Sequence, residues 1–134
     1  MTPEGRVVAD IKAAMKDLGC DVRKCQWVGH AGAPDLFIMV PGTVTNDAGH
    51  HFWVEVKALG ETPKAHQVRE HGVMKRAGCA VYVHDNAADV VRHIQFYLQY
   101  DYDLFRKAVG VEIKYRQRAA QREAKNARGK KDTV

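Results

Sequence analysis

Two carboxylates and one ammonium occur in two apolar segments that the sequence predicts to be neighbouring strands. Asp35 opens the run Asp-Leu-Phe-Ile-Met-Val, and Glu55 and Lys57 lie two apart in Phe-Trp-Val-Glu-Val-Lys. Side chains two apart in a strand point to the same face, so Glu55 and Lys57 share one face of the sheet. If the two strands pair through the loop 41–51, Asp35 comes to lie beside Glu55. Two carboxylates beside an ammonium suit a hard divalent cation such as Mg²⁺, which needs only one or two protein carboxylates.

Each of these residues also has a purely structural interpretation. Asp35 follows a proline and could cap a turn, while Glu55 and Lys57 could form a strand-face ion pair, worth ~0–1 kcal/mol when exposed. Glu55 is flanked by large apolar residues, however, and a buried lone carboxylate is costly unless it is paired or binds a metal. A lysine beside a cation could orient or deprotonate a water molecule, or neutralise charge in a transition state.

The elements that must position these residues follow from apolar periodicity and turn residues. We expect helices over 3–18 and 64–76 and from residue 86 toward 105 with an interruption at Gly110, and strands over 22–28, 35–40, 52–57 and 79–84. The strand 35–40 is almost continuously apolar, as expected for a strand covered on both faces. The first three strands are close enough in sequence for a meander, and the helix 64–76 makes a crossover to a parallel fourth strand. The fold class is therefore α/β, with a mixed central β-sheet flanked by helices.

Charge is concentrated at one end of the 134-residue chain, whose net charge is +5. Residues 112–134 contain eight Lys or Arg and three Asp or Glu, whereas the first 111 residues contain thirteen of each. Such a basic segment favours a polyanion, usually nucleic acid, although a solvated terminus has the same composition. We expect a single domain over 1–111, followed by a basic tail over 112–134 that is either helical or disordered.

The composition argues against several other classes of protein. Three cysteines without a Cys-x-x-Cys pair indicate neither a disulfide framework nor a structural zinc site, and the seven histidines lack the spacing of a metal site. No apolar run approaches the ~20 residues that span a bilayer. The N-terminal segment has no apolar signal, so we expect a cytoplasmic protein without a membrane partner.

The order of these motifs resembles a known family of nucleases. A glycine-rich loop, Pro34-Asp35, Glu55-Val56-Lys57 and then Gln67 in the following helix is similar to the VRR-NUC branch of the PD-(D/E)XK, or restriction-endonuclease-like, superfamily, including its small stand-alone phage and bacterial members. The match covers about residues 4–84. It implies a restriction-endonuclease-like fold and a metal-dependent DNA endonuclease that hydrolyses phosphodiester bonds with Mg²⁺ or Mn²⁺.

The resemblance also implies roles for individual residues. Asp35 and Glu55 would ligate the metal, the backbone carbonyl of Val56 would complete the site, and Lys57 would position the nucleophilic water. Two further residues correspond to supporting positions of the family: Glu4 on the first helix, and Gln67 near the lysine. Their alternatives are a first-turn glutamate that favours the helix dipole and a solvated helix residue.

The expected partner is DNA. Six basic residues are candidates for contacting it: Lys64, Arg69, Lys114, Arg116, Arg118 and Arg122. By resemblance to the stand-alone members, the protein would be a homodimer acting on branched DNA, such as Holliday junctions, in a bacterial or phage-infected cell. A dimer would also hold two sites in the fixed relation that cutting two strands requires. The alternatives are a non-catalytic DNA-binding module that retains a nuclease-like fold, and an interaction domain with a solvated tail.

Overall fold

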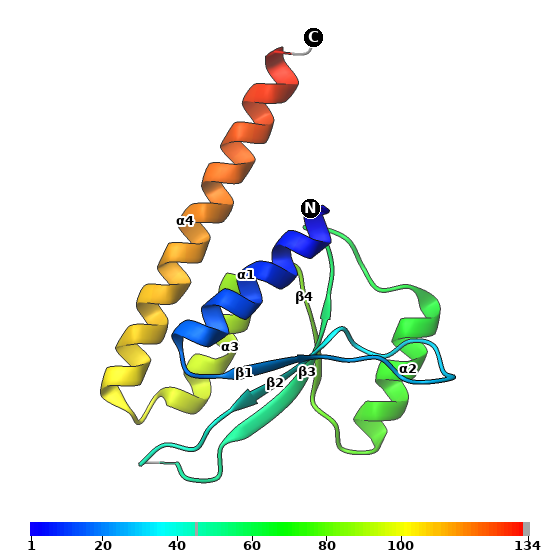
Figure 1. Cartoon of the computed structure of the whole chain (residues 1–134), viewed down its shortest axis with the longest axis vertical. Helices are drawn as coiled ribbons and strands as arrows, with labels where there is room; N and C mark the ends of the chain where they lie inside the picture. The colour runs from blue at the N-terminus through cyan, green and yellow to red at the C-terminus, as the bar shows by residue number, and fades with distance from the viewer. Residues whose placement is uncertain (45, 133–134) are drawn as a thin grey trace.

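The computed structural model describes residues 1–44 and 46–132, with side chains described up to residue 129. Its elements are α1 (Pro3–Asp17), β1 (Asp21–Lys24), β2 (Leu36–Val40), β3 (His50–Val56), α2 (Ala65–Arg76), β4 (Val81–His84), α3 (Ala87–Leu98) and α4 (Tyr102–Asp132). The strands form one sheet in the order β1-β2-β3-β4 (Figure 1). The first three strands are antiparallel, and β4 lies parallel to β3 after the α2 crossover. The expected α/β fold with a mixed sheet flanked by helices is confirmed.

The pairing of β2 with β3 decides where the carboxylates lie. Leu36 is paired with Val54, and both side chains are buried. Asp35 and Glu55 each lie one residue further along these antiparallel strands. They therefore come next to each other, on the face opposite to the buried pair.

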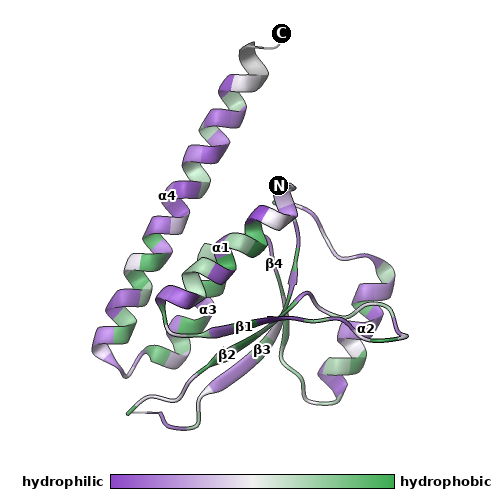
Figure 2. Cartoon of the chain, viewed as in Figure 1, coloured by the Kyte–Doolittle hydropathy of each residue, from purple (hydrophilic) through white to green (hydrophobic). Residues whose placement is uncertain are grey.

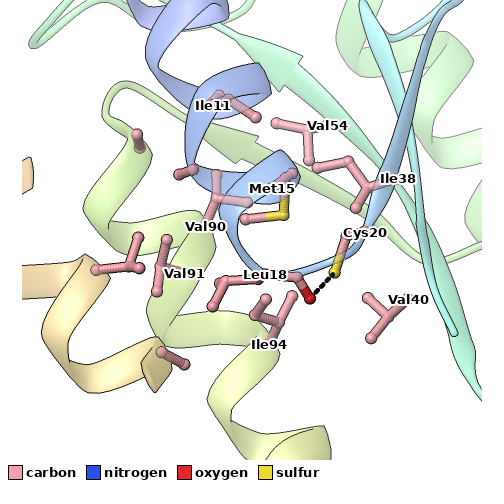
Figure 3. Close-up of a cluster of buried hydrophobic side chains, with 14 of the residues drawn as sticks. Ile11, Met15, Leu18, Cys20, Ile38, Val40, Val54, Val90, Val91 and Ile94 are labelled. Carbon is pink, nitrogen blue, oxygen red and sulfur yellow. Dashed lines mark hydrogen bonds between the residues drawn. The ribbon is translucent and has the colours of Figure 1, made fainter. Parts of the chain in front are cut away.

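The hydrophobic core lies on one face of the sheet, between β2, β3 and the helices α1 and α3. Ile38, Val54, Met15 and Ile94 meet there (Figure 3). On β2 the burial alternates, because the side chains between the core positions are only half-buried. The expectation that both faces of this strand are covered was therefore wrong. An apolar run does not by itself show how many layers cover it.

β1 is shorter than the expected strand 22–28, since it ends at Lys24. One more contact follows, in which the Cys25 N–H donates to the Asp35 carbonyl at 2.8 Å. Pro34, the residue before Asp35, has no N–H with which to extend the pairing. Residues 25–35 instead form the loop that leads into β2.

The break between the last two helices lies earlier than expected. α3 ends at Leu98, and Asp101 caps α4 by accepting a hydrogen bond from the Leu104 N–H at 3.2 Å. α4 then continues through Gly110, which does not interrupt it. A glycine inside a helix costs ~1 kcal/mol relative to alanine, and the burial of Ala108 and Val111 on either side offsets that cost.

The basic segment is helical as far as Asp132, and residues 133–134 lie outside the described part of the chain. α4 runs through residues 111 and 112 without a break. A continuous helix does not show where the domain ends, and the division into domain and tail stays a prediction. None of the described helices is both long and apolar enough to cross a membrane.

A cluster of histidine and aromatic rings fills the space between β3, β4 and α3. The His93 ring lies 4.3 Å from that of Phe52 and 4.2 Å from that of Tyr82. Burial, followed by the nearby His84 and His50, lowers the pKa of His93 to about 4. The pKa values of His50 and His84 are also lowered, in both cases chiefly by burial.

These histidines make stability depend on pH. Between the ordinary His93 pKa of 6.5 and its folded value of about 4, the unfolded chain binds a proton that the folded protein does not. Stability is therefore full above pH ~6.5 and falls as the pH drops toward 4. We expect His93→Phe to flatten this fall. The measurement is the melting temperature of both proteins from pH 7 to 4, and an unchanged pH dependence would contradict this role of His93.

Candidate active site

Asp35 is held at the start of β2 by the neighbouring strand. Its Oδ2 accepts a hydrogen bond from the Val56 N–H at 2.7 Å. This bond crosses from β2 to β3 and fixes the carboxylate beside the segment Glu55-Val56-Lys57. The expected juxtaposition of the acids therefore follows from the strand register together with one side-chain hydrogen bond to the backbone.

Glu55 is 1% exposed, although it is a carboxylic acid. Burial raises its pKa to about 9, helped by a hydrogen bond to Asp35 and by the negative charge of that residue. Lys57 acts in the opposite direction and Glu4 adds a smaller upward effect. At neutral pH, without a cation, the Glu55 carboxyl is thus protonated, because two negative charges cannot be buried side by side.

Lys57 is 7% exposed and points toward α2. Its Nζ donates to the Oε1 of Gln67 at 2.8 Å. The same oxygen accepts the Lys64 N–H at 2.9 Å, which ties off the first turn of α2. Gln67 therefore both caps the helix and holds the lysine, so its predicted place near Lys57 agrees with the geometry.

His71 is a residue of this site that the sequence reasoning missed. It lies one helical turn after Gln67, and its Nε2 lies 3.3 Å from the Oε1 of Glu55. Both side chains are buried, and neither atom has a hydrogen-bond partner among the described residues. One turn of α2 thus places Gln67 on Lys57 and His71 on Glu55. Gln67 and His71 are four residues apart and so share one face of the helix, and Glu55 and Lys57 are two apart and so share one face of the strand. This matched spacing was the signal in the sequence that could have indicated His71.

The position of α2 depends on the glycine-rich loop. Gly32 has φ +98°, and a Cβ there would lie 2.9 Å from the His66 carbonyl oxygen of α2. Only glycine allows both this conformation and this close approach. The loop is further tied to the helix by His30, whose Nε2 is 3.3 Å from Glu70 Oε1.

Glu4 lies at the other side of the site, in the first turn of α1. It lines a cavity of about 660 Å³ together with Asp35, Lys24, Lys12, Ala58 and Glu61. Thr2 caps the helix by accepting the Gly5 N–H at 3.0 Å. This cap orients the first turn, so Glu4 faces the same cavity as Asp35.

The expected DNA-contacting residues fall into two groups. Lys64 and Arg69 are exposed at α2, next to the site. The others lie on α4, where three of them pair with acids of other helices: Lys114 is 3.8 Å from Asp17, Arg116 is 3.1 Å from Asp89, and Arg122 is 2.6 Å from Asp10. Arg116 also contacts Glu112 of the same helix at 2.7 Å. Arg118 instead lies over the Tyr115 ring, 5.1 Å from its centroid.

The donor set at Asp35 and Glu55 fits a hard cation. Two adjacent carboxylates, one of them buried and neutral, are stabilised when a divalent ion replaces the shared proton. The described residues contain no group of three or more His, Cys, Asp or Glu side chains placed to hold a metal. Mg²⁺ retains waters and needs only one or two protein carboxylates, which the pair Asp35 and Glu55 supplies.

A comparison with solved structures identifies the family. The chain is similar to a structure described as a VRR_NUC domain, at 35% sequence identity and a TM-score of 0.60, over 72% of this chain and 99% of that one. The chain belongs to the VRR_NUC family. No protein-family model and no curated protein matches the sequence. This protein therefore has a nuclease-like fold, and the predicted restriction-endonuclease-like architecture is confirmed.

Proposed function

We propose that this VRR_NUC protein is a metal-dependent DNA endonuclease that hydrolyses phosphodiester bonds. The observation that carries the proposal is the forced pairing of Asp35 with the buried Glu55 beside Lys57. Burial, together with the neighbouring Asp35, raises the pKa of Glu55 to about 9. A fold that needed only stability would not keep a buried carboxyl beside a second one. The arrangement is accounted for if both acids bind Mg²⁺ or Mn²⁺.

The residues then have distinct roles. Asp35 and Glu55 would hold the cation, with the Val56 carbonyl as a further ligand, and the metal would supply neutralisation of phosphate charge and activation of water. Lys57 positions the attacking water and places positive charge beside the scissile phosphate. Gln67 keeps the ammonium in place through its 2.8 Å hydrogen bond. Glu4 adds negative charge at the cavity and supports cation binding.

His71 orients Glu55 for the cation. When Glu55 is ionised, the His71 Nε2–H at 3.3 Å can donate to Oε1 and leave the other oxygen for the metal. We expect His71→Leu to weaken Mn²⁺ binding about 10- to 100-fold, with partial recovery in His71→Gln, which keeps a donor. Isothermal titration calorimetry measures the affinity, and His66→Leu, at an exposed position of the same helix, is the matched control. Equal affinity in His71→Leu and His66→Leu would refute the role.

The finer properties follow the family resemblance. We propose a homodimer that acts on branched DNA such as Holliday junctions, with Lys64 and Arg69 close to the cleaved strand. One chain holds one pair of acids, so paired cuts in two strands need two chains in a fixed arrangement.

The test is cleavage of plasmid, linear duplex and four-way-junction DNA with and without Mg²⁺. We expect cleavage only with the metal, and faster cutting of the junction. Binding without cleavage of any of these substrates, unchanged by Asp35→Asn, would instead identify a non-catalytic DNA-binding module.

A further inference from the structure

The second half of α4 extends beyond the body of the protein. Among the residues of this helix up to 129, Tyr115 is the last that is buried, and after it only Ala119 and Arg122 are half-buried. Figure 1 shows this half rising past the N-terminus of α1, and Figure 2 shows it as mostly hydrophilic. Its helical state therefore rests on good helix formers such as Ala, Arg, Gln and Lys rather than on packing.

The basic residues of this half are of two kinds. Arg116 pairs with Asp89 of α3 and Arg122 with Asp10 of α1, and these ion pairs hold the helix to the body. Arg118, Lys125 and Arg128 are exposed and have no ion pair among the described residues. They are spaced seven and ten residues apart, which puts all three on one side of the helix. Residues 116–129 contain five basic residues and one acid, Glu123.

This half of α4 lies at the same end of the molecule as the candidate active site. One side of this half lines a cavity of about 350 Å³ with Pro3 and Arg6 of α1 and with Leu59, which lies two residues after Lys57. The α4 residues that line it are Tyr115, Ala119, Arg122, Glu123 and Asn126. Pro3 also lines the larger cavity that contains Asp35. The first turn of α1 thus lies between the two cavities, and this half of α4 lies on the other side of that turn from Asp35.

We propose that residues 116–129 form an arm whose Arg118, Lys125 and Arg128 bind backbone phosphates of duplex DNA beyond the cleaved bond. This inference rests on the proposed function, because it places the cleaved DNA at Asp35 and Glu55. From Tyr115 to Arg128 the helix is about 20 Å long at ~1.5 Å per residue. That length spans roughly 6 base pairs at ~3.4 Å each.

The inference is tested by DNA binding with Ca²⁺ in place of Mg²⁺, as a function of salt. The variant Arg118→Gln/Lys125→Gln/Arg128→Gln is compared with Lys75→Gln/Arg76→Gln/Lys107→Gln, which removes three exposed charges at the ends of α2 and α4 away from the arm. We expect the arm variant to bind a 30-base-pair duplex about tenfold more weakly or worse at ~0.1 M salt, with a salt slope smaller by about 2.7. The control variant stays within about twofold of wild type.

Duplex length separates this inference from the proposed function. On a duplex that ends ~4 base pairs from the cut, arm variant and wild type should cleave equally with Mg²⁺, since the arm has nothing to bind. The proposed DNA-binding role of the arm would be refuted if the arm variant and the control variant bind the long duplex equally. This holds whether both bind like wild type or both are weakened to the same extent. Absence of cleavage by the wild type, with binding through the arm intact, would overturn the nuclease and not the arm.

Discussion

Replacing Lys57 with alanine is expected to reduce DNA cleavage about 10²- to 10⁴-fold, the range that a positioned acid–base group contributes. DNA binding with Ca²⁺ should change little, because Lys57 is only 7% exposed and adds little contact surface to the duplex. The fold should also persist, because Gln67 Oε1 still accepts the Lys64 N–H that starts α2.

The measurement is the single-turnover rate on supercoiled plasmid, with Lys107→Ala as the control for removal of an exposed lysine away from the site. Lys107→Ala should cut within a few-fold of wild type. If Lys57→Ala cuts as fast as wild type, Lys57 has no part in the chemistry, and the ammonium is only a structural partner of Gln67.

Replacing Glu55 with glutamine is expected to abolish cleavage and yet raise the stability of the metal-free protein. In the folded state the carboxyl keeps a proton up to pH about 9, whereas its ordinary pKa is 4.5. Between these values the folded protein binds a proton that the unfolded chain has released, so wild-type stability falls as the pH rises. Because the glutamine amide of Glu55→Gln does not titrate, the stability of the variant does not fall with pH in this way.

Thermal melts in EDTA at pH 7 and 8.5 measure the effect. We expect a melting temperature several degrees above wild type, with the difference larger at pH 8.5. Addition of Mn²⁺ should stabilise the wild type and not the variant. Glu61→Gln, an exposed acid of the same cavity, serves as the control. A variant that is less stable than wild type in EDTA, or that gains as much from Mn²⁺, contradicts the assignment.

Local patterns made much of this fold predictable. The apolar runs of the second and third strands and the turn residues between them predicted an antiparallel pairing of the two strands. The position of Asp35 opposite Glu55 followed from that pairing. Gln67 was accessible through the family resemblance alone, since a polar residue on a helix carries no physical signal of what it faces.

The remaining features depend on packing between distant segments. The burial of Ala108 and Val111 against the body keeps α4 helical through Gly110, and a sequence window cannot show that contact. His71 was missed because its partner, Glu55, lies on another element at a spacing set by how α2 packs on the sheet. The ion pairs of Arg116 with Asp89 and of Arg122 with Asp10 were likewise hidden, because these acids lie on other helices.

The most direct test of the account is a crystal structure of the protein soaked in Mn²⁺, with the ion located by its anomalous scattering. We predict one site per chain at which oxygens of both Asp35 and Glu55 lie within about 2.0–2.3 Å of the ion. An ion bound by only one of these residues, or bound elsewhere while both carboxylates remain paired through a proton, would contradict the proposed metal site and with it the nuclease mechanism.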